Sequence, residues 1–492
     1  MRLSKKYLIL FSALGLAGCA VGPDYEPPKV DVPEAFRDQP ATPEASTESI
    51  ADLGWWEVYK DERLQELIHT ALENNKDLKV AAARVEQSRQ MSAQARSQYF
   101  PSVTASGGIS RGRNQYDGSP NPQGGSTSDD ALAVLGATWE IDVWGRIRRL
   151  NESAQARYLS SEEGRSGVIL SLVGDVAQSY FELLELDLEL EIAHRTTESF
   201  ERSARIFGER RQGGVASRLE TSRAEAARAQ AAASIPDVER AIAQKENQLS
   251  ILLGQPPGKI ERTVKFAEKL VPPEVPIGIP ASLLSRRPDL RASEQNLRAA
   301  NADIGVAIAE YFPKIGLSTF LGRVSPEVSA FTAGSGNAWS VAGSAAMPIF
   351  EAGRITAQVR EARARWDEAV AQHDSSVLNA LGEVSNALIA REKYSASRVE
   401  WEKAVTALND AVSVSMARYA IGEASYYEVL EAQQELFPAE NSLARTRLNH
   451  VLSVVQLYRA LGGGWQAENV KGESVEGQSD KGDKSALKES HG

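Results

Sequence analysis

The chain has 492 residues, of which 42% are hydrophobic and 25% are charged, a balance typical of a folded protein and too polar for a bundle of membrane helices. Its formal net charge of −11 makes it a poor candidate for nucleic-acid binding, so we expect no nucleic-acid partner. After the amino terminus, no apolar run approaches the ~18 residues that a transmembrane helix needs. Any part that crosses a membrane must therefore consist of short alternating strands.

Residues 1–18 have the pattern of a lipoprotein signal peptide. A basic region that includes Arg2 precedes an apolar core from Tyr7 to Leu16, and small residues lead to Cys19. This end resembles the bacterial lipobox, in which the cysteine is acylated at sulfur and becomes the new first residue. The alternative is an incidental cleavage site beside a bystander thiol. We expect a covalent lipid on Cys19, with no other cofactor and no metal. By the same resemblance, Ala20 in place of aspartate favours the outer membrane.

The segment 19–50 is rich in proline and poor in apolar residues, which predicts an extended, lipid-bearing leader. Cys19 is the only cysteine, which excludes disulfides within one chain. Removal of residues 1–18 takes away three positive charges, so the formal charge of −11 becomes −14 in the mature chain. An acidic mature chain is also a poor candidate for binding anionic lipid.

A first structural repeat is predicted over residues 51–254. Asp61 is a plausible helix cap, and a second helical pattern runs from Asp77 to Tyr99. Two runs of alternating hydrophobicity, at about 102–112 and 131–142, then predict strands of membrane-spanning length. A soluble hairpin is the alternative interpretation of these strands, because the signal is weak in each segment.

A long helix is predicted from about 146 to 212, because this stretch lacks proline and is rich in alanine, glutamate, arginine and leucine. At 1.5 Å per residue it would be about 100 Å long, which suits a rod or tube crossing a compartment. It ends at a glycine-rich turn, and a helix returns from Ser217 to Leu253. We expect Pro236 to kink that helix or to split it.

The remainder of the chain repeats this pattern. Seven prolines in 255–288 predict an irregular equatorial connector without a helix, although a short strand or two is possible. A polar tail over 463–492 is expected to be disordered. The second repeat, 289–462, contains predicted strands at about 314–323 and 338–349, a long helix at about 354–421, a second turn, and a returning helix interrupted at Pro438.

The duplication is visible in the residues themselves. Asp77-Leu78 returns as Asp289-Leu290, 212 positions later, and Gly214 returns as Gly422 at an offset of 208. A repeat of this length is one supersecondary unit used twice. The second tip of the chain differs from the first in carrying an acidic pair. The helix-to-strand junctions are also repeated, as Tyr99, Phe100 and Pro101 and again as Tyr311, Phe312 and Pro313.

Two repeats give four candidate membrane strands. Four strands cannot close a barrel with a water-filled lumen, and an open sheet edge is not tolerated in lipid. If the strands cross a membrane, several chains must therefore contribute to one barrel.

Several motifs along the chain are specific in combination: Val21-Gly22-Pro23-Asp24-Tyr25, Trp55-Trp56, Leu252-Leu253-Gly254, Arg286-Arg287-Pro288-Asp289-Leu290, Tyr311-Phe312-Pro313 and Pro348-Ile349-Phe350. In these motifs the chain resembles the TolC-like outer membrane factor family, in particular its lipoprotein members, which are the exit channels of tripartite efflux pumps. This resemblance implies a mainly α fold with membrane β-strands. A homotrimer forms a 12-stranded outer-membrane β-barrel continuous with a 12-helix periplasmic α-barrel. The implied partners are a periplasmic adaptor, an inner-membrane RND-type transporter and outer-membrane lipid.

The resemblance places a periplasmic gate at the ends of the long helices. The acidic pair of the aperture falls on Glu428 and Glu431, which lie on one helix face because they are three residues apart. At ~6 Å and an effective dielectric of ~20, two such charges repel by roughly 3 kcal/mol. The closing tyrosine falls on Tyr419 and its acidic partner on Glu220, whereas the basic residue that locks some members is replaced by Ala424. A solvated outer helix face is the alternative interpretation of the two glutamates.

The same resemblance assigns adaptor docking to the two turns, which would otherwise be plain helix–helix connections. The residues are Gly214, Val215, Ala216 and Ser217 in the first turn, and Gly422, Glu423, Ala424 and Ser425 in the second.

The leading functional prediction is a passive outer-membrane exit channel for small molecules. A type I protein-secretion channel and a non-conducting structural lipoprotein are the alternatives. We do not expect an enzyme, because the five histidines are scattered and neither a phosphate loop nor a nucleophile elbow is found.

Overall fold

A computed structural model describes residues 20–30, 32–33, 36, 54, 58, 61–113, 127–262, 283–325, 331 and 336–463. The predicted signal peptide with Cys19, most of the leader beyond residue 30, and nearly all of the predicted tail lie outside these residues. The chain divides into two units. The first comprises Met1–Val30, Ala82–Glu163 and Arg291–Ser376, and the second comprises Asp31–Ala81, Gly164–Leu290 and Val377–Gly492.

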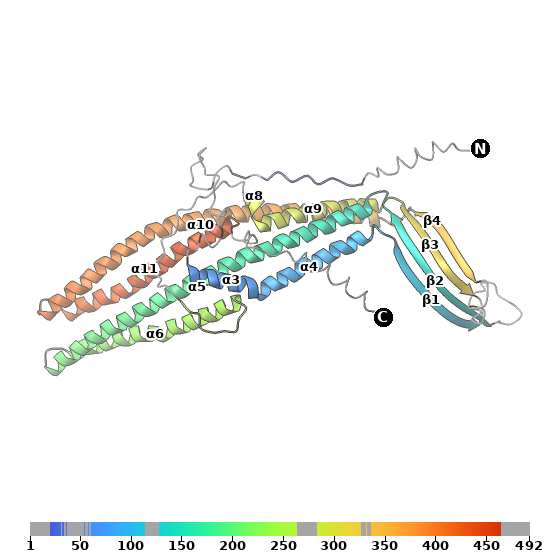
Figure 1. Ribbon diagram of the computed structural model, residues 1–492. Coiled ribbons are helices and arrows are strands. Elements are labelled where there is room, and N and C mark those ends of the chain that lie inside the picture. Colours follow the sequence, from blue (N-terminus) through green and yellow to red (C-terminus); the bar gives the residue numbers. More distant parts are fainter. Residues whose placement is uncertain are drawn as a thin grey trace, which may run out of the picture. The chain divides into compact units, whose positions relative to one another are not determined.

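The first unit contains a four-stranded antiparallel sheet in the order β1-β2-β3-β4 (Figure 1). Its strands are β1 (Ser102–Arg113), β2 (Thr127–Ile141), β3 (Lys314–Ser325) and β4 (Asn337–Ala346). The central β2–β3 pair joins the two sequence repeats, and β1 and β4 are the edges. Strand β2 begins four residues before the prediction. Strand β4 ends three residues before the predicted position 349, because Pro348 cannot donate a ladder hydrogen bond.

The register of the sheet places odd-numbered residues of all four strands on one face. Ala105 pairs with Leu135, Leu135 with Leu321, and Leu321 with Trp339. Many large, exposed apolar side chains of the sheet share this face, including Trp339 at 74% exposure and Val103 at 70%. The other face is mostly glycine, alanine, serine and threonine, and its large apolar residues are Leu132, Val134, Phe320 and Val324. The sheet therefore has one apolar and one predominantly small and polar face.

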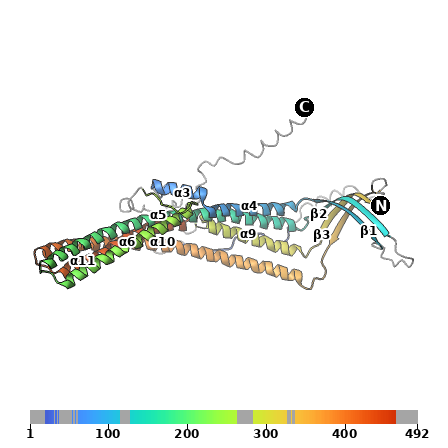
Figure 2. The ribbon, with the colours of Figure 1, turned by 90° about the horizontal axis from the view of Figure 1, so that it is seen from below.

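Four helical segments of the first unit adjoin the sheet (Figure 2). They belong to α4 (Lys76–Ser97), α5 (Arg146–Gln212), α9 (Pro288–Ala309) and α10 (Arg354–Ala420). The proposed junction residues lie between α4 and β1 and between α9 and β3.

Two tryptophans fix these junctions to the sheet. The indole of Trp139 donates to the Tyr99 carbonyl at 3.0 Å. That of Trp144 donates to the Pro313 carbonyl at 2.9 Å, and its ring stacks on Phe312 with centroids 4.8 Å apart.

The start of the leader packs against α5 and α9 of the same unit. Val21 N–H donates to the Trp144 carbonyl at 2.9 Å, and the Asn301 amide donates to the Pro23 carbonyl at 2.9 Å. The guanidinium of Arg149 pairs with Asp24 at 2.7 Å. Gly22 has a φ of +98°, and a Cβ there would lie 2.5 Å from Gly305 Cα. This close approach requires glycine.

The second unit consists of antiparallel helices. It contains α3 (Glu62–Asn74), α6 (Arg218–Leu252), the short α8 (Leu283–Arg286), α11 (Tyr426–Ala460) and the distal parts of α5 and α10. Asp61 caps α3 by accepting a hydrogen bond from Leu64 N–H at 3.0 Å.

Two predictions about this unit are wrong. First, neither proline splits its helix, because α6 and α11 are each a single helix of 35 residues that continues through its proline. A proline removes one backbone donor, and the remaining hydrogen bonds of a long helix can carry the helix past it. Second, the connector contains α8, a single helical turn, and α9 begins at Pro288 because the first position of a helix needs no N–H donor.

A pair of equivalent contacts closes each repeat in the second unit. The side chain of Asn75 donates to the Leu252 carbonyl at 2.9 Å, and that of Arg287 donates to the Ala460 carbonyl at 2.8 Å. Asn75 and Arg287 are 212 residues apart, and the two carbonyls are 208 apart, so the sequence offsets describe a structural repeat.

Helix α5 contains one 18-residue window apolar enough to cross a membrane. Of that window, 67% is buried in the protein. The buried helix is consistent with a protein core, and the window was not apparent as an uninterrupted apolar run because it includes Asp175.

Candidate functional site: the paired helical tips

The first tip, residues 213–217, reverses the chain between α5 and α6. Gly214 has a φ of +79°, which favours glycine. The Val215 N–H donates to the Arg210 carbonyl at 2.9 Å. Ser217 then starts α6 with a capping box: its hydroxyl accepts from Glu220 N–H at 3.2 Å, and the Glu220 carboxylate accepts from Ser217 N–H at 2.6 Å.

The second tip, residues 421–425, repeats this construction between α10 and α11. Gly422 has a φ of +84°, and Glu423 N–H donates to the Arg418 carbonyl at 2.9 Å. The Glu428 carboxylate accepts from Ser425 N–H at 3.0 Å, and the Arg418 guanidinium lies 3.6 Å from it. The backbone hydrogen bond from Ser425, with a contribution from Arg418, lowers the pKa of Glu428. This carboxylate is therefore ionised and engaged at the helix start.

Aromatic side chains from both repeats join the two tips into one cluster. The ring centroid of Phe207 lies 3.9 Å from that of Tyr426 and 5.2 Å from that of Tyr419. Phe207 is 2% exposed and Tyr426 4% exposed, and the Arg210 guanidinium lies 4.3 Å from the centre of the Tyr419 ring. The cluster is completed by Phe200, Ala224, Ala227, Ala231 and Leu430, with Ala204 packed against it.

The predicted gate residues occupy different surroundings. Glu428 and Glu431 are both exposed on α11, and the Glu431 carboxylate makes no hydrogen bond or ion pair within the described chain. Tyr419 is half-buried against Phe207 and Arg210, whereas the carboxylate of Glu220 is occupied by Ser217. Tyr419 and Glu220 are therefore not joined to each other in the described part of this chain.

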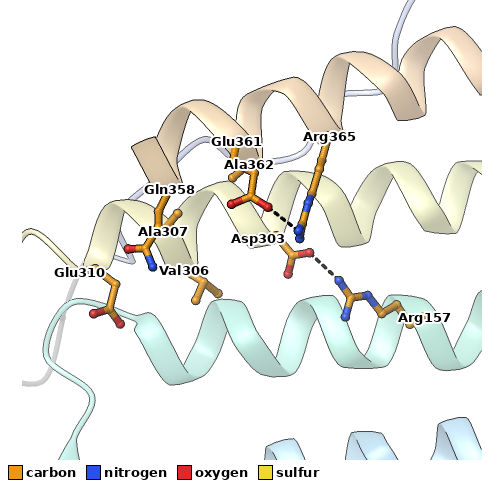
Figure 3. Close-up of a pocket in the computed structure, with 9 residues that line it drawn as sticks. All are labelled: Arg157, Asp303, Val306, Ala307, Glu310, Gln358, Glu361, Ala362 and Arg365. Carbon is orange, nitrogen blue, oxygen red and sulfur yellow. Dashed lines mark hydrogen bonds and ion pairs between the residues drawn. The ribbon is translucent and has the colours of Figure 1, made fainter. Parts of the chain in front are cut away.

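A cavity of about 420 Å³ lies in the first unit between α5, α9 and α10 (Figure 3). Arg157 of α5 reaches Asp303 of α9 at 2.6 Å, and Arg365 pairs with Glu361 on α10 at 2.5 Å. Glu310, also in the lining, pairs with a lysine of β3 at 3.0 Å. The three carboxylates of this cavity are thus each balanced by a base.

Comparison with known proteins agrees with this architecture. The family model of outer membrane efflux proteins matches residues 67–255 and 279–463, which correspond closely to the two repeats. The toluene efflux pump outer membrane protein TtgC of Pseudomonas putida is 35% identical over 92% of this chain and 94% of its own length. The solvent efflux pump outer membrane protein SrpC of Pseudomonas putida is 35% identical over 94% of this chain and 98% of its own length.

The solved structure of the outer-membrane channel OprN has a TM-score of 0.82 and 32% identity, covering 91% of this chain and all of that one. The chain belongs to the outer membrane efflux protein family. The predicted family, the mainly helical fold with membrane strands, the outer-membrane location and the role as an efflux channel are confirmed.

The sequence interpretation of this efflux protein missed the residues that join its tips. Phe207 and Tyr426 are buried in the shared cluster, and burial raises the pKa of Tyr426 to about 12. Arg210 holds the first tip through its carbonyl and contacts the second repeat through its side chain. The apolar pattern marks Phe207 as a core residue. In contrast, no repeat offset could reveal Arg210, because the equivalent Arg418 makes different contacts.

Proposed function

We propose that this efflux protein is the homotrimeric exit duct of a tripartite pump, and that it passes small molecules passively from a periplasmic adaptor and an inner-membrane RND-type transporter to the exterior. The four-stranded sheet carries the proposal. One of its faces is apolar enough for lipid, the other is small and mostly polar, and β1 and β4 have no further strand partner among the described residues. The named relatives act in toluene and solvent efflux, which supports small organic molecules as substrates.

The unpaired edges support oligomerisation. In a bilayer each unpaired backbone group costs several kcal/mol, so β1 of one protomer must pair with β4 of the next. Three protomers would supply twelve strands, enough for a lumen. The odd-numbered apolar face would then contact lipid, and the even-numbered face would line water.

The leader supports an assignment of faces in the helical wall of the first unit. Asn301 and Gly305 of α9 face the leader, whose Cys19 we propose to be lipidated and anchored in the outer membrane. A lipid-bearing segment must run outside the duct. Asp303 lies two residues from both, about 200° around the helix, so we assign the Asp303 side of α9 to the luminal face.

We assign the gate to the tips. Glu431 of three protomers would form a ring of carboxylates that favours cations, and its lack of a partner in the described chain leaves its charge available. Glu428 adds charge to the ring, but it also caps α11. Tyr419 and Glu220 would set how closely the tips approach. Both tips would dock the adaptor.

The test is single-channel recording from purified protein in planar bilayers. Glu431→Lys alters the proposed ring and spares the cap, so we expect it to reduce cation selectivity and to change conductance. Glu239→Lys, at an exposed position on α6 away from the tip, is the control with the same charge change. Equal records for the wild type and Glu431→Lys would exclude the gate assignment. A protein without any conductance would contradict the duct itself.

A further inference from the structure

The two tips are built on one scaffold but differ in surface charge. Positions 210 and 418 are both arginine, 214 and 422 both glycine, 217 and 425 both serine, and 220 and 428 both glutamate. These four pairs make the turns and helix starts described above. Residues that face outward between them are therefore free to differ, because they do not shape the turn.

Charge reverses between equivalent segments. Residues 205–224 contain five arginines and two glutamates, whereas residues 413–432 contain one arginine and three glutamates. The formal charges are therefore +3 and −2. The clearest single reversal is Arg223, which is replaced by Glu431 at the equivalent position.

The differing charges are exposed and available. Arg211, Arg218 and Arg223 are exposed, and their guanidinium groups form no hydrogen bond or ion pair within the described residues. Glu423 and Glu431 are likewise exposed, with carboxylates that have no such partner in the same part of the chain. The scaffold charges behave differently, since Glu220 and Glu428 are held by the capping serines.

Each tip also exposes apolar side chains beside these charges. Leu219 is 61% exposed at the second residue of α6, and Tyr427 is 59% exposed at the equivalent position of α11. Val215 is 78% exposed on the first tip and Ile421 72% on the second. Figures 1 and 2 show both turns at the same end of the helices. A partner that reaches this end therefore meets two exposed apolar patches. The patch on the first tip has a charged rim of arginines, and the patch on the second tip has a charged rim of glutamates.

We propose that the two tips are non-equivalent docking sites for the adaptor. The first tip takes an acidic surface with an apolar contact, and the second takes a basic surface with an apolar contact. This inference rests on the proposed function, and charge complementarity selects the occupant. The opposite charges also determine the orientation of the adaptor, because an adaptor placed one tip out of position would meet like charges, which repel it.

The test uses a photo-crosslinking phenylalanine analogue at position 219 or at position 427 of the full-length protein in intact cells. Adducts are identified to the residue by mass spectrometry. We expect both positions to capture the same periplasmic protein, at an acidic segment from position 219 and at a basic segment from position 427. Capture of segments with the same charge at both positions would overturn the inference.

Charge variants complete the experiment. Arg211→Glu with Arg218→Glu should lower the crosslink yield from position 219 about tenfold, and Glu423→Arg should do so from position 427. The matched neutral variants, with glutamine at the same positions, should lose less of the crosslink yield. Arg223→Glu, beyond the first turn, replaces the double variant if that protein does not assemble. Equal losses for neutral and reversed variants would contradict the charged rims.

The outcomes separate this inference from the proposed function. If neither position captures a periplasmic protein while the trimer is present in the outer membrane, docking at the tips is wrong, and with it that part of the proposed function. If both positions capture one protein without charge dependence, docking stands and the non-equivalence of the tips is wrong.

Discussion

At the joint that closes each repeat, the two repeats make the same contact with different chemistry. Asn75 meets the Leu252 carbonyl with a neutral amide, while Arg287 meets the Ala460 carbonyl with a guanidinium that also pairs with Asp289 and Glu383. Both repeats place a side-chain donor on the equivalent carbonyl, but only the second repeat adds ion pairs to that hydrogen bond. A duplicated fold can thus keep its backbone while one copy acquires a charge network that the other lacks.

The largest expected effect comes from breaking this joint. Arg287 is only 7% exposed, so Arg287→Ala would leave Asp289 and Glu383 without their shared partner and the Ala460 carbonyl unsatisfied. Asp289 and Glu383 are more than half exposed and would be solvated after the change, so the loss is that of the hydrogen bonds of Arg287. A hydrogen bond to a charged group contributes about 1.5–3 kcal/mol and a neutral one about 0.5–1.5 kcal/mol. Asn75→Ala is therefore the matched, milder change. Thermal denaturation of the purified oligomer should rank the two variants in this order, and equal losses would contradict the comparison.

The middle of the long helices offers a second contrast between repeats. Glu185 of α5 is 6% exposed, and its Oε1 has no hydrogen-bond partner in the described residues, whereas the equivalent Lys393 of α10 is exposed. Burial, with the charge of the neighbouring Glu189, raises the pKa of Glu185 to about 8. Glu182 adds to this rise and Arg445 opposes it.

The raised pKa of Glu185 predicts the direction in which stability changes with pH. An unfolded glutamate titrates near pH 4.3, so between that value and about 8 the folded chain holds a proton that the unfolded chain has lost. The contribution of Glu185 to the free energy of unfolding is largest below the unfolded pKa. It is lost as the pH rises through the folded pKa, by up to about 5 kcal/mol. Glu185→Gln should therefore denature at a higher temperature than the wild type at pH 8 and nearly the same temperature at pH 5. Lys393→Gln is the control, and a wild-type pH dependence in Glu185→Gln would exclude this role.

The same contrasts show what the sequence could reveal. The offsets of 212 and 208 predicted equivalent tips, and the glycines and serines at 214, 217, 422 and 425 indicated where the helices reverse. Local rules suffice for such turns, because one residue with positive φ and one capping side chain determine them. Pro236 and Pro438 showed the limit of these rules, since tertiary packing retained helices that propensity alone would break.

The contacts of the tip could not be predicted in this way. The gate pair Glu428 and Glu431 was chosen by spacing, but spacing does not show that Ser425 and Arg418 hold only Glu428. Likewise, the assignment of Tyr419 to the gate does not show that its ring lies beside Arg210. How one helix is rotated against another depends on the packing of both, and a repeat offset carries no information about it.

The smallest expected effect concerns the two equivalent arginines of the tips. Arg210 contacts Tyr419 of the other repeat, and Arg418 stays within its own tip near Glu428. A cation–π contact at a partly exposed site contributes about 0.5–1 kcal/mol, so Arg210→Gln should loosen the contact between repeats without unfolding either tip. Its channel open probability in planar bilayers should rise about two- to fivefold, whereas Arg418→Gln should leave the Tyr419 contact intact and change the open probability less. Arg210→Lys, which keeps the charge but not the planar group, should fall between wild type and Arg210→Gln. An equal rise for Arg210→Gln and Arg418→Gln would show that net charge at the tip, and not the contact between repeats, restrains opening.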